Sequence, residues 1–157
     1  MEESVQNIYG HRLRIRACGI CIEDNTILMV NHLGITPHHF WAPPGGGIEF
    51  GESAPDCLIR EFKEETGLDI EVCDFLFGCE FMKHPLHAIE LFFQVKMVGG
   101  VLKKGTDPES GEDQIIKDVA FIGWKQLDEL KSEEIHGIFQ IPKEKCEISQ
   151  LRGYFKL

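Results

Sequence analysis

The sequence lacks the features that would place the chain in a membrane. No apolar run approaches the roughly 18 residues that a membrane-spanning helix requires. The polar opening over residues 1–4 carries neither the basic nor the apolar region of a secretory signal. We therefore expect a cytoplasmic location.

An excess of basic residues is also missing. The 16 lysines and arginines are outnumbered by 26 aspartates and glutamates, for a formal net charge of −10. This balance excludes strong long-range attraction to a long nucleic acid or to an anionic membrane. The acids are concentrated, since residues 46–68 hold six acids and two bases and residues 107–118 hold five acids and one base. Any polyanion must therefore bind through local groups.

Repeats and low-complexity linkers are absent as well. At 157 residues the chain is long enough to bury a core of its own. We predict that residues 1–157 form a single domain of the α/β (α+β) class, with a mixed β-sheet and few helices. Residues 132–157 show no clear pattern, so their role stays open.

The six cysteines are not spaced as a disulfide framework. They lie in apolar stretches, which favours reduced, buried thiols. The alternative is that Cys18 and Cys21 form half of a zinc site, but the sequence supplies no second pair of ligands at a suitable spacing.

Residues 11–18 alternate between basic and apolar side chains. This period of two predicts a strand with one face formed by Arg12, Arg14 and Arg16 and an apolar opposite face. Arg14 and Arg16 are candidates for binding substrate phosphates, because a guanidinium matches phosphate oxygens; the alternative is the wet face of an outer strand. Further strands are expected at 27–30, which would complete a hairpin, at 68–81, 88–98 and 119–124, and in short form at 48–50.

The period changes after Ser53, where residues 54–66 are predicted to form a helix. Ser53 is a suitable N-cap, and Gly67 stands where a helix commonly ends. The stripe that we expect to pack on the sheet consists of Pro55, Leu58, Ile59, Phe62 and Thr66.

Three carboxylates on this helix share one side of it. Glu61, Glu64 and Glu65 fall within an arc of roughly 100°. Carboxylates this close repel one another unless a cation neutralises them, and hard divalent ions such as Mg²⁺ or Mn²⁺ prefer oxygen ligands. The alternative is a solvated acidic face. The run Gly45–Gly47 favours the metal site, because glycine lets the backbone come close to a ligand.

The same segment resembles a complete Nudix box, G-x5-E-x7-R-E-U-x-E-E-x-G-U. The chain has Gly46, five residues, Glu52, seven residues, and then residues 60–68, which read Arg-Glu-Phe-Lys-Glu-Glu-Thr-Gly-Leu. Phe62 is a mild departure at the first U position, where the family has a bulky aliphatic residue. The resemblance implies a Nudix-like αβα sandwich over nearly all of the chain.

The resemblance also implies an activity, the divalent-metal-dependent hydrolysis of a nucleoside diphosphate linked to another moiety. Mg²⁺ or Mn²⁺ would be the cofactor, a metal-bound water would attack phosphorus, and the partner would be a small nucleotide derivative. By the box match, the residues that hold metal are Glu61, Glu64, Glu65 and the Gly46 carbonyl. The expected catalytic residues include Glu61, Glu64 and Arg60, while Glu52 and Gly67 are structural residues of the box.

Family members often recruit another acid outside the box as a base or ligand. Glu112 is the first candidate, with Glu109 and Asp113 as further ones, and the alternative is a solvated acidic loop.

The substrate and the assembly are less defined by the sequence. A proline shortly after the box is associated with ADP-ribose hydrolysis, and Pro85 comes 17 residues after Leu68, slightly late for that marker. The remaining substrate candidates are a (deoxy)nucleoside triphosphate, which could be oxidised, and an ADP-sugar such as ADP-ribose. A non-catalytic nucleotide-sensing domain is the alternative function, and a homodimer is left open because dimers are common in similar proteins.

Overall fold

The structure, a computed structural model, describes residues 3–34, 36–106 and 116–157. Its centre is a mixed sheet with the strand order β3-β2-β1-β6-β5-β8, to which β4 is added beside β1 and β7 beside β2. The pairs β1–β6 and β5–β8 are parallel, and the other pairs are antiparallel. The strands are β1 (Leu13–Glu23), β2 (Thr26–His32), β3 (Phe40–Ala42), β4 (Gly45–Gly47), β5 (Leu68–Lys83), β6 (Leu86–Gly100), β7 (Ile116–Gly123) and β8 (Gly153–Lys156).

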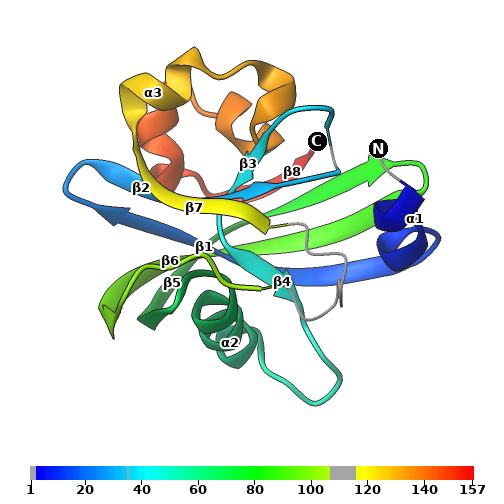
Figure 1. Ribbon diagram of the computed structural model, residues 1–157, viewed down its shortest axis with the longest axis horizontal. Coiled ribbons are helices and arrows are strands. Elements are labelled where there is room, and N and C mark those ends of the chain that lie inside the picture. Colours follow the sequence, from blue (N-terminus) through cyan, green and yellow to red (C-terminus); the bar gives the residue numbers. More distant parts are fainter. Residues whose placement is uncertain (1–2, 35, 107–115) are drawn as a thin grey trace.

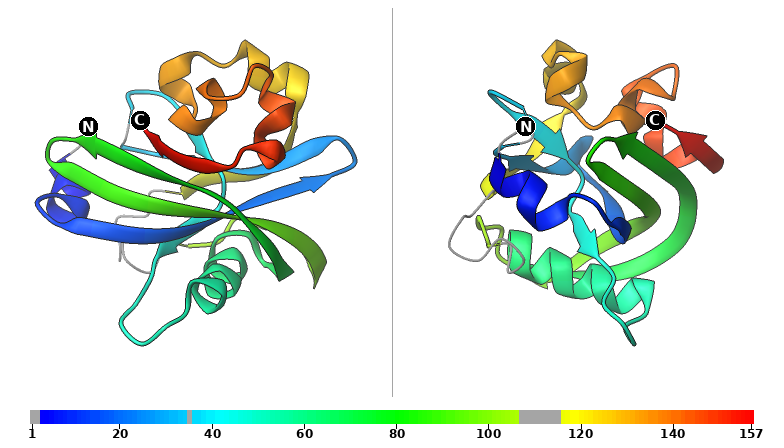
Figure 2. Two further views of the ribbon diagram at one scale, coloured as in Figure 1. Left: turned by 180° about the vertical axis from the view of Figure 1, so that it is seen from behind. Right: turned by 90° about the vertical axis from the view of Figure 1, so that its right-hand side faces the viewer.

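Helices cover both sides of the sheet. The α-helices are α1 (Glu3–Tyr9), α2 (Ala54–Thr66) and α3 (Trp124–Glu129), and the 3-10 helices are η2 (Ser132–Glu134), η3 (Gly137–Gln140) and η4 (Lys145–Gln150). Figures 1 and 2 show α2 on one side of the sheet and α3 with the 3-10 helices on the other. This arrangement confirms the predicted αβα sandwich. None of the helices in the described part of the chain is long and apolar enough to cross a membrane.

The two faces of β1 belong to two separate hydrophobic clusters. Cys18 packs with Phe77 and Phe92 beneath the 3-10 helices, whereas Cys21 packs with Phe62 beneath α2. Because the thiols of Cys18 and Cys21 lie on opposite faces of the strand, they do not face one metal position. All six cysteines are free, and four of them are buried.

The start of β1 is oriented differently from the sequence prediction. Arg14 and Arg16 are partly buried, while Leu13 and Ile15 are 54% and 49% exposed. The strand is central in the sheet rather than an outer strand, and the side that carries the arginines is enclosed by other parts of the chain. The alternative of a wet face on an outer strand is therefore wrong for Arg14 and Arg16, whereas Arg12 before β1 is exposed.

The predicted bounds of α2 are correct, but its predicted buried face is rotated. Ile59 is 44% exposed, and Pro55 is exposed as well, whereas Glu61 and Glu65 are buried. The helix turns its carboxylates toward β4, which has no side chains, so the two acids can pack where a hydrophobic stripe was expected.

The short strand lies at Gly45–Gly47 and not at the predicted residues 48–50. It pairs with β1, with Gly45 opposite Cys18 and Gly47 opposite Arg16. A Cβ at Gly45 would collide with the backbone of β1, so only glycine allows this close pairing. The strand expected at 88–98 is longer than predicted, because β6 continues through Gly99 and Gly100.

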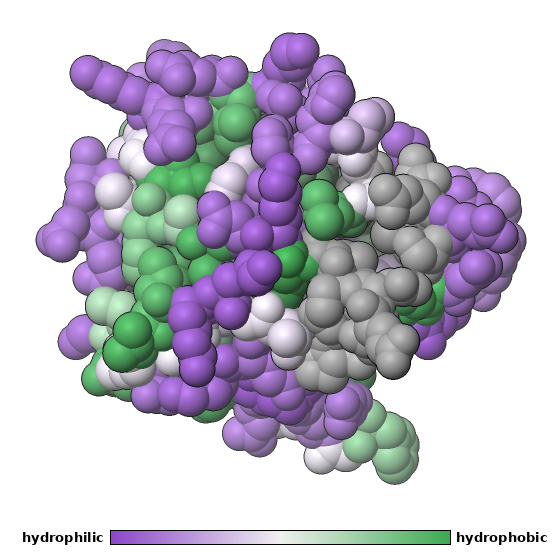
Figure 3. Space-filling model, viewed as in Figure 1, coloured by the Kyte–Doolittle hydropathy of each residue, from purple (hydrophilic) through white to green (hydrophobic). Residues whose placement is uncertain are grey.

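On the face shown in Figure 3, which has the orientation of Figure 1, polar residues lie around the edge and apolar residues gather on the left-hand side. Residues 132–157, for which the sequence showed no clear pattern, fold as the three 3-10 helices and β8. Ile138 and Ile148 in this segment are fully buried. The C-terminal part of the chain is therefore an integral component of the core.

The corrected orientation of α2 can be tested by comparing two substitutions. Phe62 is fully buried in the core, so Phe62→Ala should lower the free energy of unfolding by about 3–5 kcal/mol. Ile59→Ala, on the exposed side of the same helix, should lower it by less than about 1 kcal/mol. Urea unfolding followed by circular dichroism gives both values, and similar losses in the two variants would contradict the observed orientation.

Candidate active site

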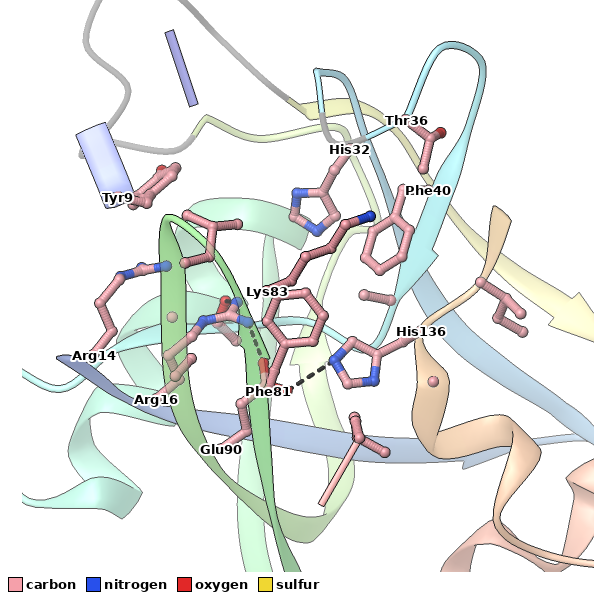
Figure 4. Close-up of a pocket in the computed structure, with 18 of the residues that line it drawn as sticks. Tyr9, Arg14, Arg16, His32, Thr36, Phe40, Phe81, Lys83, Glu90 and His136 are labelled. Atoms are coloured by element: carbon pink, nitrogen blue, oxygen red, sulfur yellow. Dashed lines mark hydrogen bonds and ion pairs between the residues drawn. The ribbon is translucent and has the colours of Figure 1, made fainter. Parts of the chain in front are cut away.

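A pocket of about 410 Å³ opens where β1, β4, α2 and the β5–β6 hairpin meet. Figure 4 shows side chains entering it from all sides, including Arg16 and Glu90 from the sheet, Phe40 from β3, and His136 from the C-terminal segment. The lining is mostly apolar with a few convergent charged groups, which is the character of a small-molecule site.

One end of the pocket is formed by the contact between α2 and β4, which we call the α2–β4 seam: Gly45–Gly47 facing Glu61 and Glu65. Glu65 is 2% exposed, and its Oε2 accepts a hydrogen bond of 3.0 Å from the Gly45 N–H. A Cβ at Gly46 would collide with the Glu61 carboxylate. The glycines therefore admit both carboxylates against the backbone.

Burial has a clear electrostatic effect on Glu61. Loss of solvent raises the pKa of its carboxyl group to about 7, Arg60 opposes this shift, and the charge of Glu64 adds to it. A carboxylate that is hard to ionise in this environment would be stabilised by a nearby cation. The seam is thus suited to receive positive charge.

Arg60 joins the elements around the seam. It binds Glu52 through two hydrogen bonds, Nε to Oε1 at 2.8 Å and Nη2 to Oε2 at 3.0 Å. Its Nη1 also donates to Glu61 at 2.7 Å and to Glu64 at 3.2 Å, and Nη2 donates to the Gly47 carbonyl at 3.3 Å. The hydrogen bond with Arg60 lowers the pKa of Glu52 to about 2. The guanidinium therefore orients the carboxylates of Glu61 and Glu64.

The two ends of α2 have the capping predicted from the sequence. The Ser53 hydroxyl accepts the Asp56 N–H at 3.2 Å. Gly67 adopts a left-handed conformation with φ 76°, and its N–H donates to the Lys63 carbonyl at 3.1 Å. These caps fix where the helix begins and ends, and hence the height of Glu61 and Glu65 beside β4.

The donor atoms at the seam fit a hard divalent cation. Glu61 and Glu65 supply carboxylate oxygens, and the Gly46 carbonyl oxygen lies 3.6 Å from the Cys57 sulfur, so it faces α2. Oxygen donors of this kind suit Mg²⁺ or Mn²⁺. In residues 3–34, 36–106 and 116–157, no three His, Cys, Asp or Glu side chains are arranged as a ready metal cluster. Glu61 and Glu64 are instead each directed to Arg60, which forms an ion pair with both.

The floor of the pocket contains a buried ion pair that the sequence did not reveal. Glu90 is 2% exposed and forms a salt bridge with Arg16 through Oε1, while its Oε2 lies 2.8 Å from Nε2 of His136. Nδ1 of His136 accepts the Ile138 N–H, so Nε2 carries the proton donated to Glu90. Arg16 also donates from Nη2 to the Gly45 carbonyl at 2.9 Å.

This network controls the ionisation of Glu90. Burial alone would raise the pKa of the carboxyl group, but favourable interactions with His136 and Arg16 hold it well below its ordinary value. Arg16 donates hydrogen bonds to both Glu90 and the Gly45 carbonyl, and it thereby connects β6 with the α2–β4 seam. A sequence signal for Glu90 did exist, since it shares a strand face with apolar Ala88 and Phe92.

The sequence-predicted residues fall into three groups. Those that line the pocket are Gly46, Glu61, Glu65, Arg14 and Arg16. Glu52, Arg60 and Glu64 lie beside it and contact one another through Arg60. The acids proposed outside the box, Glu109, Glu112 and Asp113, lie outside the described residues.

Comparisons with known proteins identify relatives of this chain. A family model described as "NUDIX domain" matches residues 12–143. The chain is 32% identical over 123 residues to the ADP-ribose pyrophosphatase of Methanocaldococcus jannaschii, an alignment that covers 68% of this chain and 72% of that protein. It is 34% identical over 70 residues to the 8-oxo-dGTP diphosphatase of Proteus vulgaris, which covers 41% of this chain and 59% of the relative.

Solved structures show the same fold. The crystal structure of a UDP-X diphosphatase superposes with a TM-score of 0.64 at 24% sequence identity, over 92% of this chain and 67% of the other.

The buried network predicts how stability depends on pH. Glu90→Gln leaves the Arg16 guanidinium in the pocket floor without its counter-charge. The substitution should therefore lower the free energy of unfolding by roughly 3–5 kcal/mol at neutral pH. Because the folded pKa of Glu90 lies below its ordinary 4.5, its stabilisation is present above that pH and is lost as the pH falls below it. Below pH 4.5, the difference in free energy of unfolding between wild type and variant should shrink by up to about 1.4 kcal/mol per pH unit.

Urea unfolding of both proteins between pH 7 and pH 3 measures this difference. Stability curves that run parallel over the whole range would show that Glu90 does not titrate as its contacts indicate.

Proposed function

The chain belongs to the NUDIX family, and from this we propose that it is a divalent-metal-dependent hydrolase of nucleoside diphosphates linked to another moiety. Members of the family act on pyrophosphate bonds of small nucleotide derivatives. The observation that carries the proposal for this chain is the α2–β4 seam, where Glu61, Glu65 and Gly46 open onto one pocket. We propose that residues 1–157 act as a single domain.

The oxygens of the seam would hold Mg²⁺ or Mn²⁺, which supplies charge neutralisation for the diphosphate and activates the water that attacks phosphorus. Glu61, Glu65 and the Gly46 carbonyl are the proposed ligands. Arg60 binds Glu64 through Oε2, which leaves Oε1 for the metal or for the proton of the attacking water.

Arg60 and Glu52 serve as an orienting pair in this proposal. Their two parallel hydrogen bonds fix the guanidinium, and the guanidinium in turn fixes the carboxylates of Glu61 and Glu64. Groups behind the ligands commonly determine ligand geometry and affinity in this way.

The substrate that we propose is an ADP-sugar such as ADP-ribose, or a (deoxy)nucleoside triphosphate that can carry an oxidised base. Two relatives support these candidates, one named an ADP-ribose pyrophosphatase and the other an 8-oxo-dGTP diphosphatase. Phe40 and Phe81 line the pocket and offer ring faces to a base. The reducing interior of a cell suits the free thiols, which supports a cytoplasmic location.

A panel of nucleotides tests the activity, with phosphate released by a coupled phosphatase as the readout, in the presence and absence of Mg²⁺. Glu65→Gln should lower kcat by about 100-fold or more, because it removes a charge that the metal requires, and Glu64→Gln should also lower it severely. Glu71→Gln is the matched control, since Glu71 is exposed and does not line the pocket.

Unchanged kinetics in both box variants would rule out the proposed metal site. Tight binding of a nucleotide by wild type, without hydrolysis under Mg²⁺ or Mn²⁺, would instead favour the non-catalytic nucleotide-sensing function.

The acid outside the box can be assigned by a separate substitution. If Glu112 is the general base or a metal ligand, Glu112→Gln should reduce Mg²⁺-dependent turnover by about 100-fold while leaving the melting temperature unchanged. Glu109→Gln and Asp113→Asn test the two further candidates from the same segment in the same assay. Near-normal activity of Glu112→Gln would remove Glu112 from the mechanism.

A further inference from the structure

The floor of the pocket is one face of the sheet, and it carries basic side chains at successive positions. Across β1 and β6, Arg16 is paired with Glu90 and Arg14 with Ala88, and on β5 Phe81 is paired with Ala88. Residues two apart on a strand face the same side at a spacing of roughly 7 Å. Each step along β1 from Arg16 to Arg14 therefore leads away from the α2–β4 seam and toward the β5–β6 hairpin.

Lys83 continues this face at the hairpin. It is paired with Leu86, two residues beyond Phe81 on β5, and both lysine and leucine line the pocket. Figure 4 shows the Lys83 side chain directed across the pocket toward His32 and Phe40. Within the described part of the chain, no hydrogen bond or ion pair engages its ammonium group. Its charge is thus available at the pocket mouth.

The charges of the pocket are separated along its length. The charge of Arg16 is matched by Glu90. The Arg14 guanidinium lies 4.2 Å from the centre of the Tyr9 ring, a cation–π contact that orients it. Two of the lining acids, Glu61 and Glu65, are at the seam.

One further acid lines the pocket, the exposed Glu133 of η2, and it lies away from the β5–β6 hairpin in sequence. Glu80 of β5 does not line the pocket and is hydrogen bonded to the lining residue His87 at 2.8 Å. The pocket is therefore acidic at the seam and basic at the hairpin end, which we define as Arg14 and Lys83.

We propose that this basic hairpin end binds a second anionic group of the substrate. The substrate class is then a nucleoside diphosphate derivative with a further phosphate or carboxylate. This group would lie roughly 10 Å from the seam, because three strand residues separate Ala17, which is paired with Gly46, from Arg14. A guanidinium and an ammonium are suited to such groups. The inference rests on the proposed function, because it places the hydrolysed diphosphate at the seam.

Two matched pairs of compounds test the proposal. UDP-glucuronate differs from UDP-glucose by a carboxylate on the sugar, and ADP-ribose 2′-phosphate differs from ADP-ribose by a phosphate on a ribose. Within at least one pair, wild type should favour the member with the additional carboxylate or phosphate by about tenfold in kcat/KM. The two pairs also distinguish whether the extra charge belongs to the leaving sugar or to the nucleoside.

Variants assign the preference to the hairpin end. Lys83→Met should reduce the tenfold preference to about twofold and leave kcat/KM of the member without the additional charged group unchanged. Lys83→Arg should retain most of the preference. Lys96→Met removes an exposed lysine from β6 outside the pocket, so it controls for the change in net charge. Arg14→Met should act in the same direction as Lys83→Met, and Arg14→Lys should rescue it.

Binding measurements separate failure of this inference from failure of the proposed function. Calorimetric titration of the same pairs into Glu64→Gln, with and without Lys83→Met, gives dissociation constants that do not depend on turnover. An anionic preference in binding without hydrolysis by wild type would support the hairpin site and overturn the enzyme. Hydrolysis of both members of each pair at equal kcat/KM, unaffected by Lys83→Met, would overturn the hairpin site and leave the enzyme intact.

Discussion

The site depends on the close approach of one helix to a strand that has no side chains. Glu61 and Glu65 lie against Gly45–Gly47 because no Cβ intervenes, and this contact buries two carboxylates that would otherwise be solvated. Glu61 has Arg60 as its ion-pair partner and Glu65 accepts the Gly45 N–H, and the burial of both carboxylates makes the seam attractive to a cation. The geometry of the site therefore depends jointly on the glycines of β4, the capped helix α2 and Arg60.

Local signals in the sequence were sufficient for the part of the site that local structure determines. The bounds of α2 followed from Ser53 and Gly67, and both residues form the expected caps. The buried side of the helix could not be obtained in the same way. Periodicity placed Ile59 in the core, because hydrophobicity alone does not indicate that the neighbouring strand consists of glycines and favours carboxylates over apolar groups.

The floor of the pocket was beyond reach for a different reason. Glu90 and His136 matter through pairing between segments that are distant in the chain, such as the parallel register of β1 and β6. A strand pattern predicts that a residue is in a sheet but not which strand lies beside it. The basic period at the start of β1 was recognised, yet its inward orientation required knowledge of what encloses it.

The contacts of Glu90 with Arg16 and His136 also determine when the site can form during protein synthesis. Arg16 and Glu90 are 74 residues apart in sequence, and His136 follows Glu90 after most of the remaining sheet. A nascent chain that has already exposed the whole box still lacks the group that completes the floor of its pocket. Because such long-range contacts form late, the pocket floor can be completed only after synthesis has passed His136.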